Sequence, residues 1–473
     1  MTYVGAVPTT GDFKKLDSIT TSSATTFNLR QGGVAVYPQS ANHCIVSLNG
    51  VIQAPVDAFT IVNDTIVFSS SLAGTDVINF ILVLGNVNDI GVVSDDTIST
   101  AKLQANSVTY PKTSGLVRPN SKNLLINSDM AVAQRGASAT GKTASGYYTC
   151  DRWNLSISSA GTWTQTQESL TSGDAHADGF SKSLKMDNTT ADGSLGSGDY
   201  NQITYKFEGQ DLQLLKKGTS NAKKVTVGFW IKATKTGTNI LEFYDNTNSR
   251  QVSQSYTVSS SNTWEYKVVN FPADTTGSLT NNNAQQAVLV FWLGAGSNFS
   301  SGTLNTSWAS ATNANRAVGQ VNHADSTSNN WEITGVQMEV GEYTSSTLPP
   351  FQHESYQENY DRCLRYYYRI TPSSGFRYVG WCQMDNDDTN HVAYIDFKKN
   401  MRSAPSALEQ SGTASHYKIR EASTTTCDAV PTFNNADIWY SAVSFKKSSS
   451  GFSQGEVNKA GIDGGYLGWS AEL

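Results

Sequence analysis

Short apolar runs separated by Asn, Gly, Ser and Asp recur along almost the whole chain. The run at 44–48, for example, is followed by Asn49-Gly50 and then by another apolar run. Asn-Gly favours a two-residue hairpin turn because both central residues need a positive φ. Apolar runs of about four to eight residues between turn residues are typical of β-strands. The pattern therefore predicts an all-β fold built from many short antiparallel strands.

The composition narrows the fold class further. Only 16% of the 473 residues are charged, which excludes a coiled coil or a helical repeat array, since both need abundant Glu, Lys, Leu and Ala. Aromatic residues make up 10% of the chain, too many for a disordered protein. A chain of this length exceeds a single hydrophobic core, so we expect a multidomain all-β protein of β-sandwich or jelly-roll type.

The charge balance bears on the partners. The chain carries 34 Lys and Arg residues against 40 Asp and Glu residues, a net charge of −6. Such a chain has no general attraction for phosphate backbones or anionic lipids, so we expect no nucleic-acid partner and no membrane insertion. Residues 1–11 lack the basic and apolar regions of a secretory signal, and no stretch reaches a membrane-spanning length. We therefore expect a protein made in a cytosol.

The cysteines and histidines suggest neither a disulfide framework nor a metal centre. The five cysteines are odd in number and scattered, and none forms a CxxC pair. Buried free thiols are therefore favoured. The six histidines show no HxH or HExxH spacing. No metal site and no cofactor is predicted.

The chain divides into four predicted segments. Residues 1–90 are expected to form a small β-domain whose last strand is apolar on both faces and central. Residues 91–121 carry a faint repeat with one Ile or Val per segment, typical of either a linker or a trimeric stalk whose apolar residues meet across a symmetry axis. Residues 122–350 are predicted to form a jelly-roll sandwich, and residues 351–473 a short helix followed by a distal β-domain.

Four stretches of the predicted sandwich and helix indicate which side chains face a core. The run at 225–232 alternates strictly, with its Val, Phe and Ile residues on one face and Trp230 on the other. In the run that begins at Trp264 we predict Trp264, Tyr266 and Val268 to point inward. The helix is predicted at 352–367, with its tyrosines on one stripe at helical spacing. The run at 287–293 is apolar on both faces and should lie in the middle of a sheet.

Three other stretches match motifs of catalytic or ion-binding sites, but a structural interpretation is favoured for each. Residues 136–143 fit the phosphate-loop pattern GxxxxGK[ST], yet no buried parallel strand precedes them and Gly146 would end a following helix, so a polar loop is predicted. Residues 451–455 fit the GxSxG nucleophile elbow, yet no histidine follows to act as the base. The acidic run at 385–388 is typical of a turn, because the Gly and Glu of a calcium-binding loop are missing. We predict no catalytic residues.

Aromatic side chains are the better candidates for a binding site. Exposed Trp and Tyr stack on sugar rings while neighbouring Asn, Asp and Gln bind hydroxyl groups, and both kinds of residue are abundant here. Trp264 and Trp292 are expected in the core. The candidates for exposure, next to polar loops or opposite an apolar face, are Trp230, Trp381, Trp439 and Tyr440. The low charge predicts neutral, hydroxyl-rich ligands.

Several stretches together resemble tail fibre and receptor-binding proteins of tailed bacteriophages. The similarity is strong from 122 to 400 and weak elsewhere, and the carbohydrate-binding-module-like domain of such fibres accounts for most of it. The stretches similar to that domain are NLLINSDMAVAQRG at 123–136, YTCDRW at 148–153, VTVGFWIKA at 225–233 and WEITGVQMEVG at 331–341, and QENYDRCLRYYY at 357–368 is similar to the short helix that closes it. FKKNMRSAP at 397–405 and WSAEL at 469–473 are similar to the distal β-domain of the family. More weakly, LNGVIQ at 48–53 and DAFT at 57–60 are similar to the virion-proximal module of many fibres.

The resemblance implies a non-enzymatic homotrimer located in the virion tail. Residues 1–90 would attach it to adaptor, nozzle or baseplate proteins, and the distal domains would bind a host cell-surface glycan or protein. Synthesis would take place in the host cytoplasm. Two alternatives remain: a tailspike-type depolymerase that cleaves host surface polysaccharide, and a purely structural tail component.

Overall fold

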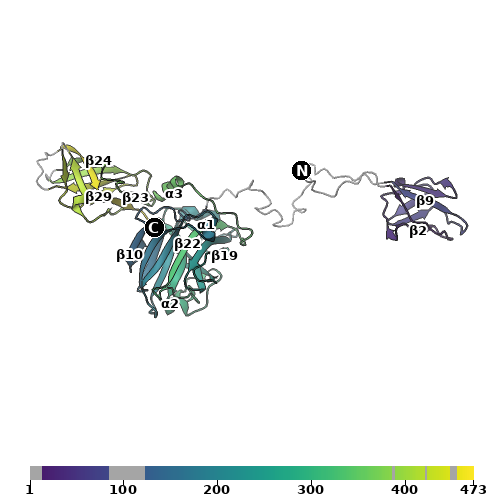
Figure 1. Ribbon diagram of the computed structural model, residues 1–473, viewed down its shortest axis with the longest axis horizontal. Helices are drawn as coiled ribbons and strands as arrows, with labels where there is room; N and C mark the ends of the chain where they lie inside the picture. The colour runs from purple at the N-terminus through teal and green to yellow at the C-terminus, as the bar shows by residue number, and fades with distance from the viewer. Residues whose placement is uncertain (1–12, 85–122, 386–388, 421–422, 448–454) are drawn as a thin grey trace. The chain divides into compact units, whose positions relative to one another are not determined.

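The computed structural model describes residues 13–84, 123–385, 389–420, 423–447 and 455–473 (Figure 1). The predicted stalk at 91–121 lies outside these residues, as does most of the acidic run at 385–388 and of the GxSxG match. The chain forms two compact units, Met1–Val108 and Thr109–Leu473. Strands dominate both units, and the prediction of an all-β fold is confirmed.

The first unit consists of short strands around a small core of its own. Asn49 and Gly50 both have positive φ, 51° and 78°, and connect two paired strands, so the predicted Asn-Gly hairpin is confirmed. The last strand, β9, lies between two others, as its apolar faces predicted. The three sheets, in spatial order, are β1 (Lys14–Lys15), β9 (Ile78–Val83), β5 (Cys44–Leu48), β6 (Val51–Ile52); β2 (Thr26–Asn28), β8 (Thr65–Phe68), β7 (Phe59–Val62); and β3 (Arg30–Gln31), β4 (Val34–Ala35).

A sandwich of two antiparallel sheets begins the second unit. The six-stranded sheet has the order β10 (Ser138–Lys142), β13 (Thr162–Ser169), β14 (Lys182–Thr190), β22 (Asn330–Val340), β16 (Val225–Ala233), β19 (Glu265–Phe271). The seven-stranded sheet has the order β11 (Gly146–Tyr147), β12 (Trp153–Ser158), β15 (Tyr200–Glu208), β20 (Gln285–Ala295), β17 (Gly237–Asp245), β18 (Arg250–Val258), β21 (Ala309–Ser310).

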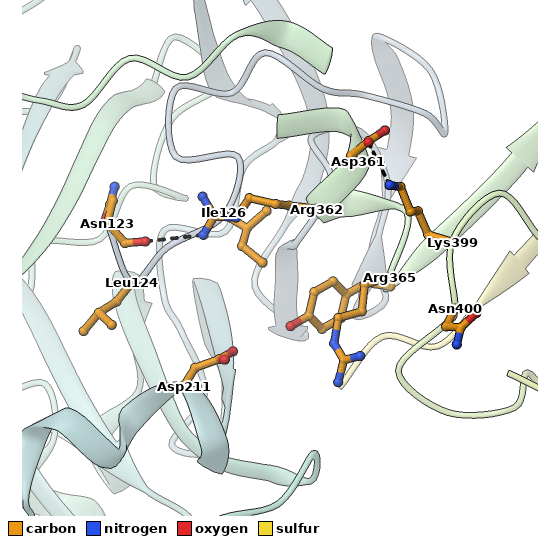
Figure 2. A pocket seen from close by; sticks show the side chains of 10 residues that line it. Asn123, Leu124, Ile126, Asp211, Asp361, Arg362, Arg365, Lys399 and Asn400 are labelled. Atoms are coloured by element: carbon orange, nitrogen blue, oxygen red, sulfur yellow. Dashed lines mark hydrogen bonds and ion pairs between the residues drawn. The ribbon is translucent and has the colours of Figure 1, made fainter. Parts of the chain in front are cut away.

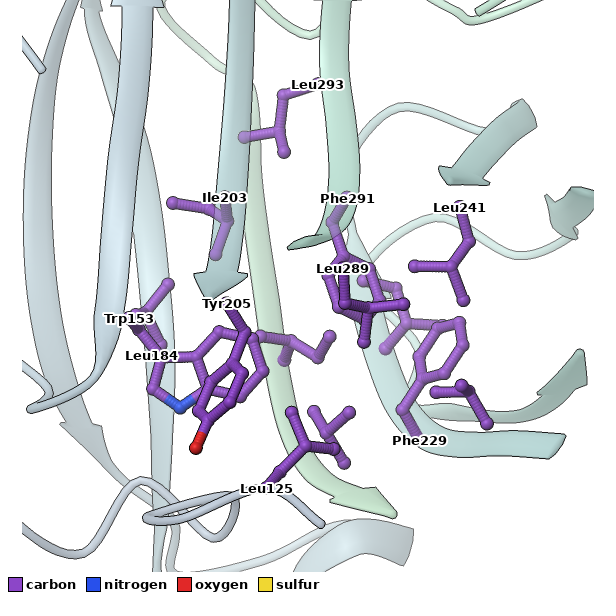
Figure 3. Close-up of a cluster of buried hydrophobic side chains, with 14 of the residues drawn as sticks. Leu125, Trp153, Leu184, Ile203, Tyr205, Phe229, Leu241, Leu289, Phe291 and Leu293 are labelled. Atoms are coloured by element: carbon purple, nitrogen blue, oxygen red, sulfur yellow. The ribbon is translucent and has the colours of Figure 1, made fainter. Parts of the chain in front are cut away.

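Aromatic side chains from both sheets fill the space between them (Figure 3). Phe291 of β20 is fully buried, with its ring centroid 5.2 Å from that of Phe229 of β16 and 6.2 Å from that of Trp153 of β12. The opposite face of β20 is also covered, because Trp292 belongs to a second buried cluster. The predicted alternation of β16 and the predicted mid-sheet position of β20 are both confirmed.

The prediction that Tyr266 and Val268 of strand β19 point into the main core is wrong. In β19 it is Val269 and Phe271 that enter the main core, whereas Tyr266 lies on the other side of the sheet, with its ring 5.3 Å from that of Trp230. Trp264 is buried, but in a separate small cluster. The outer face of the six-stranded sheet is itself partly covered, so β19 carries apolar residues on both of its faces. Alternation alone therefore cannot tell which set of side chains points into the main core.

The helix between the sandwich and the distal domain is shorter than predicted. Helix α3 spans Tyr356–Cys363 and begins with a capping box, in which Ser355 Oγ accepts from the Glu358 N–H and the Glu358 carboxylate accepts from the Ser355 N–H. It ends early because Tyr367 already pairs with Ser470 in the next sheet. Tyr356, one of the tyrosines predicted on a single stripe, is 60% exposed. The other helices among the described residues are α1 (Asp174–Ala177), α2 (Ser297–Ser300) and the 3-10 turns η1 (Ala41–His43), η4 (Gly209–Leu215), η5 (Asn313–Asn315) and η6 (Ala414–His416).

Two further sheets form the distal domain around a third core. The small sheet has the order β23 (Tyr367–Ile370), β32 (Leu467–Ser470), β26 (Glu409–Gln410). The large sheet has the order β28 (Thr424–Thr426), β27 (Tyr417–Arg420), β31 (Val457–Asp463), β24 (Phe376–Met384), β25 (Asn390–Asp396), β30 (Tyr440–Lys446), β29 (Thr432–Ala436).

The last residues of the chain bind back to the sandwich. Arg152 is buried and forms an ion pair with Glu472, and its guanidinium lies 3.5 Å from the ring centroid of Tyr366. Arg402 donates to the carbonyl of Ala471 at 2.7 Å and to that of Asn283 at 2.9 Å. These contacts join the distal domain to the sandwich through charge-assisted hydrogen bonds, of which the pair of Arg152 with Glu472 is buried.

All five cysteines are buried and unpaired, as predicted. Burial raises the pKa of Cys44 to about 11 and that of Cys427 to about 12, so these thiols stay protonated at neutral pH. Among the described helices none combines the length and the apolar character needed to cross a bilayer.

Candidate functional site

The structure places the four predicted binding residues in two different locations. Trp381 of β24 and Trp439, just before β30, are 64% and 58% exposed. Tyr440 is half-buried beside Trp439, with the two ring centroids 5.6 Å apart. Trp230 of β16 is also half-buried, but lies in a cleft on the outer face of the sandwich. The prediction that these residues bind a ligand stays a prediction.

A row of aromatic residues crosses the outer face of the large distal sheet. We call this row the distal aromatic face, and its members are Tyr378, Trp381, Tyr394, Trp439 and Tyr440. The pairing of Cys382 with Ala393 places Trp381 and Tyr394 opposite each other on the neighbouring strands β24 and β25. The ring centroids of Tyr394 and Tyr440 are 6.0 Å apart.

A β-bulge explains why Tyr378 and Trp381 share one face although they are three residues apart. In a regular strand, residues at odd spacing point to opposite faces. The register between β24 and β31 shifts between Tyr378 and Gly380, so Val379 is an extra residue and the strand resumes its alternation one position later. Tyr378 then pairs with Gly461 and Trp381 with Lys459, both on the outer side.

Exposure of so much aromatic surface points to a binding function. Tyr394 is 64% exposed, the same fraction as Trp381. Soluble proteins seldom leave contiguous large apolar side chains in water unless they meet a partner. Flat aromatic rings in a row can stack on successive planar or ring-shaped groups of a ligand. The arrangement is suited to binding, and it brings together no nucleophile with a base.

Two cations border the row. Lys459 Nζ lies 5.2 Å from the ring centroid of Tyr378 and 4.9 Å from that of Trp381. Arg420, on the next strand, donates to the Tyr378 hydroxyl at 2.7 Å and pairs in register with Lys459. Both cations therefore belong to the same surface as the aromatic rings.

The cleft that contains Trp230 has a volume of about 460 Å³ and is lined mainly by aromatic and proline residues. The Trp230 Nε1 donates to Asp178 at 3.1 Å, which fixes the indole against Tyr266. Phe180 and His353 close the other side, with ring centroids 4.9 Å apart. Burial raises the pKa of Tyr266 to about 12, so its hydroxyl remains a hydrogen-bond donor at neutral pH.

A larger groove of about 490 Å³ lies where helix α3 meets the sandwich and the distal domain (Figure 2). Four of its charged side chains, Asp361, Arg362, Arg365 and Lys399, already have partners within the protein. Asp361 pairs with Lys399 at 3.1 Å, as Figure 2 shows, and Arg362 pairs with Glu354 at 2.6 Å. Arg365 makes two hydrogen bonds to Glu208, at 2.8 and 2.7 Å. These pairs stabilise the domain junction.

The phosphate-loop match has no phosphate-binding geometry. Residues 138–142 form β10, an antiparallel edge strand, rather than the polar loop predicted, and the short strand β11 follows instead of a helix. No helix N-terminus is therefore available to an anion there. In the described part of the chain, no group of three or more His, Cys, Asp or Glu residues is arranged to hold a metal ion.

Sequence reasoning found Trp381, Trp439 and Tyr440 but missed their neighbours. Tyr394 alternates with the buried Ala393 and Ile395, so the period of two could have identified it. Tyr378 could not be found in this way, because the bulge at Val379 reverses the alternation. Lys459 and Arg420 join the row only through the pairing of β31 with β24 and β27.

Comparisons with known proteins identify no family. No family model and no curated protein sequence matches the chain. The solved structures with some likeness include the enzymatically active domain of tailspike protein 4 of bacteriophage CBA120, at 17% identity and a TM-score of 0.23. That match covers 40% of this chain and only 19% of the tailspike chain.

Two sugar-binding proteins show a similar degree of likeness. TmCBM61, solved with β-1,4-galactotriose, has 9% identity and a TM-score of 0.23, covering 46% of this chain and 99% of its own. The family 11 carbohydrate-binding module of Clostridium thermocellum, solved with a mixed-linked tetrasaccharide, has 8% identity and a TM-score of 0.22, covering 43% and 95%. Likeness at these levels establishes neither a family nor an activity.

Proposed function

We propose that the chain is a receptor-binding fibre of a phage tail that binds a host cell-surface glycan through the distal aromatic face, without cleaving it. The observation that carries this proposal is the row of exposed rings, with Trp381 and Tyr394 each 64% exposed on neighbouring strands. Each ring offers a stacking surface for a sugar. Polar groups beside the row would hydrogen-bond the hydroxyl groups.

The Trp230 cleft offers a second subsite in the sandwich. It combines an aromatic wall with a carboxylate, Asp178, and a protonated hydroxyl, Tyr266. A pocket of this kind, mostly apolar with a few fixed polar groups, is typical of small-ligand sites. It would add affinity for a saccharide without being the primary contact.

We also propose that the chain forms a trimer and attaches to the phage tail. Residues 1–90 attach the fibre to a tail protein, and three chains associate as a homotrimer. The motifs that resemble phage fibres support both statements. Three linked tips would raise the effective affinity of weak sugar contacts by a factor of about 10² to 10⁴, without any new contact. The fibre would be made in the host cytoplasm and released as part of the virion.

The first experiment measures binding of the full-length chain to a glycan array and to a panel of bacterial strains. We expect Trp381→Ala to weaken binding by roughly tenfold or more, because tryptophans at the centre of an interface carry much of the binding energy. The matched control is Leu214→Ala, which removes a 37% exposed apolar side chain from the sandwich and should leave binding unchanged. Equal binding by wild type and Trp381→Ala would refute the distal site.

Two further measurements test the absence of cleavage and the oligomeric state. Incubation of bound polysaccharide with the protein should leave its size distribution unchanged, and a shortened polymer would favour a depolymerase instead. Light scattering at micromolar concentration should give three times the mass of 51.1 kDa. A monomer under these conditions would contradict the trimeric fibre.

A further inference from the structure

We propose that the distal aromatic face binds an acidic saccharide, in which a carboxylate is attached directly to the sugar ring that stacks on Trp381. This inference rests on the proposed glycan-binding function and names the chemical class of its ligand. It departs from the neutral ligand that the low overall charge predicts. The reason is the position of two cations, Lys459 and Arg420, relative to the exposed rings.

The two cations lie side by side on the outer face of the large distal sheet. Arg420 and Lys459 are directly paired residues on neighbouring strands, where like charges destabilise a sheet. Within the described residues neither side chain forms an ion pair. By contrast, Lys418 on the same face lies 3.9 Å from Asp463. An anionic ligand bound between Arg420 and Lys459 would offset the repulsion of these two adjacent like charges.

The location of the cations indicates where the anionic group of the ligand lies. Lys459 Nζ is 4.9 Å from the centroid of the Trp381 ring, which is still 64% exposed. A sugar stacked on the open part of that indole would bring its own ring substituents next to the ammonium group. A carboxylate attached to the stacked ring would reach the Lys459 ammonium group, whereas a phosphodiester between two sugars would lie beyond the edge of that ring.

The donors left on the two cations suit a carboxylate. Arg420 uses one guanidinium nitrogen, Nη1, for the Tyr378 hydroxyl, which leaves its other N–H groups for a ligand. Lys459 has three N–H donors and is held in place between two rings. Charge-assisted hydrogen bonds from both groups would be stronger than those from neutral donors. Asp396 of β25 is an exposed carboxylate at the other end of the row. It lies opposite Tyr440 and away from β31, the strand that carries Lys459.

The test compares carboxylated glycans with their methyl esters, which have the same rings without the charge. Full-length wild type is applied to an array that carries both forms, together with neutral and with phosphorylated or sulfated glycans. We expect the strongest signals from carboxylated glycans, a loss of about tenfold or more on esterification, and weaker binding at high salt. Lys459→Gln should cause a similar loss for the acid form and leave binding of the ester unchanged.

The control is Lys224→Gln, which removes the same charge from an exposed ion pair of the sandwich with Glu342. It should bind like wild type. Equal binding of acid and ester, strongest signals from neutral or from phosphorylated and sulfated glycans, or no carboxylated glycan above the Trp381→Ala background would each overturn the inference. If Trp381→Ala still abolishes binding of a neutral glycan, the proposed function stands and only the acidic ligand is refuted.

Discussion

The sandwich and the distal sheet use the same kinds of residue in opposite ways. In the described part of 123–350, the most exposed large apolar side chain is Leu214, at 37%, and rings such as Phe291 are completely buried. The distal sheet leaves Trp381 and Tyr394 in water. The environment of the cations differs as well. Arg152 is buried in an ion pair with Glu472, whereas Lys459 lies beside the exposed rings and forms no ion pair with any described residue. Aromatic and cationic groups therefore stabilise the first region, and in the second they are available to a ligand.

The largest effect on stability should come from the sandwich core. Phe291→Ala removes a ring that contacts Phe229, Trp153 and Trp331. We expect the free energy of unfolding to fall by about 4 kcal/mol, because a cavity adds to the lost transfer free energy. Urea denaturation followed by tryptophan fluorescence measures the change. A loss below about 1 kcal/mol would show that the core is loosely packed and would weaken the comparison.

The buried ion pair at the chain end comes next. Arg152→Met should cost about 3 kcal/mol of unfolding free energy, because Glu472 then remains buried with only the more distant Arg135, at 3.8 Å. The double variant Arg152→Met/Glu472→Leu should recover most of this loss, since no uncompensated charge remains. Urea denaturation of the three proteins checks the prediction. A double variant as unstable as the single one would contradict it.

A buried histidine should make the stability of the sandwich depend on pH. Burial lowers the pKa of His323 to about 3, and its Nε2 donates to Asn239 at 2.7 Å. An unfolded histidine has a pKa of about 6.5, so the folded state is favoured above that pH and loses stability as the pH falls toward 3. Between pH 7 and pH 5 this contributes a loss of about 2 kcal/mol.

The measurement compares the pH dependence of the unfolding free energy in wild type and in His323→Gln. The variant should lose less stability between pH 7 and pH 5, whereas the exposed control His176→Gln should behave like wild type. Parallel pH profiles for wild type and His323→Gln would contradict the prediction.

The smallest effect should come from the distal aromatic face. Trp381→Ala and Tyr394→Ala should each change the unfolding free energy by less than about 0.5 kcal/mol, because most of each ring is already in water. This result, together with lost ligand binding, would separate binding from stability. A loss of about 2 kcal/mol or more would mean that the rings pack against the protein and that the contrast with the sandwich fails.

Much of the fold could be predicted from local patterns. The Asn49-Gly50 hairpin, the alternation of β16 and the central position of β20 all follow from turn chemistry and hydrophobic period. The facing of β19 and the end of α3 could not be predicted in this way. Both depend on residues far apart in the chain. Tyr266 packs against Trp230 on the outer face of the sheet, and α3 ends because Tyr367 pairs with Ser470.

Three of the candidate binding residues, Trp381, Trp439 and Tyr440, could be named from the sequence because they flank polar loops. The neighbouring Tyr378, Lys459 and Arg420 required the structure, since a bulge and the order of β27, β31 and β24 bring them together. The sequence by itself determined the all-β class, the buried free cysteines and the supply of aromatic residues, because these depend on composition and local period. Only the tertiary structure decided which rings form one surface with two cations, because strand register joins residues that are far apart in the chain.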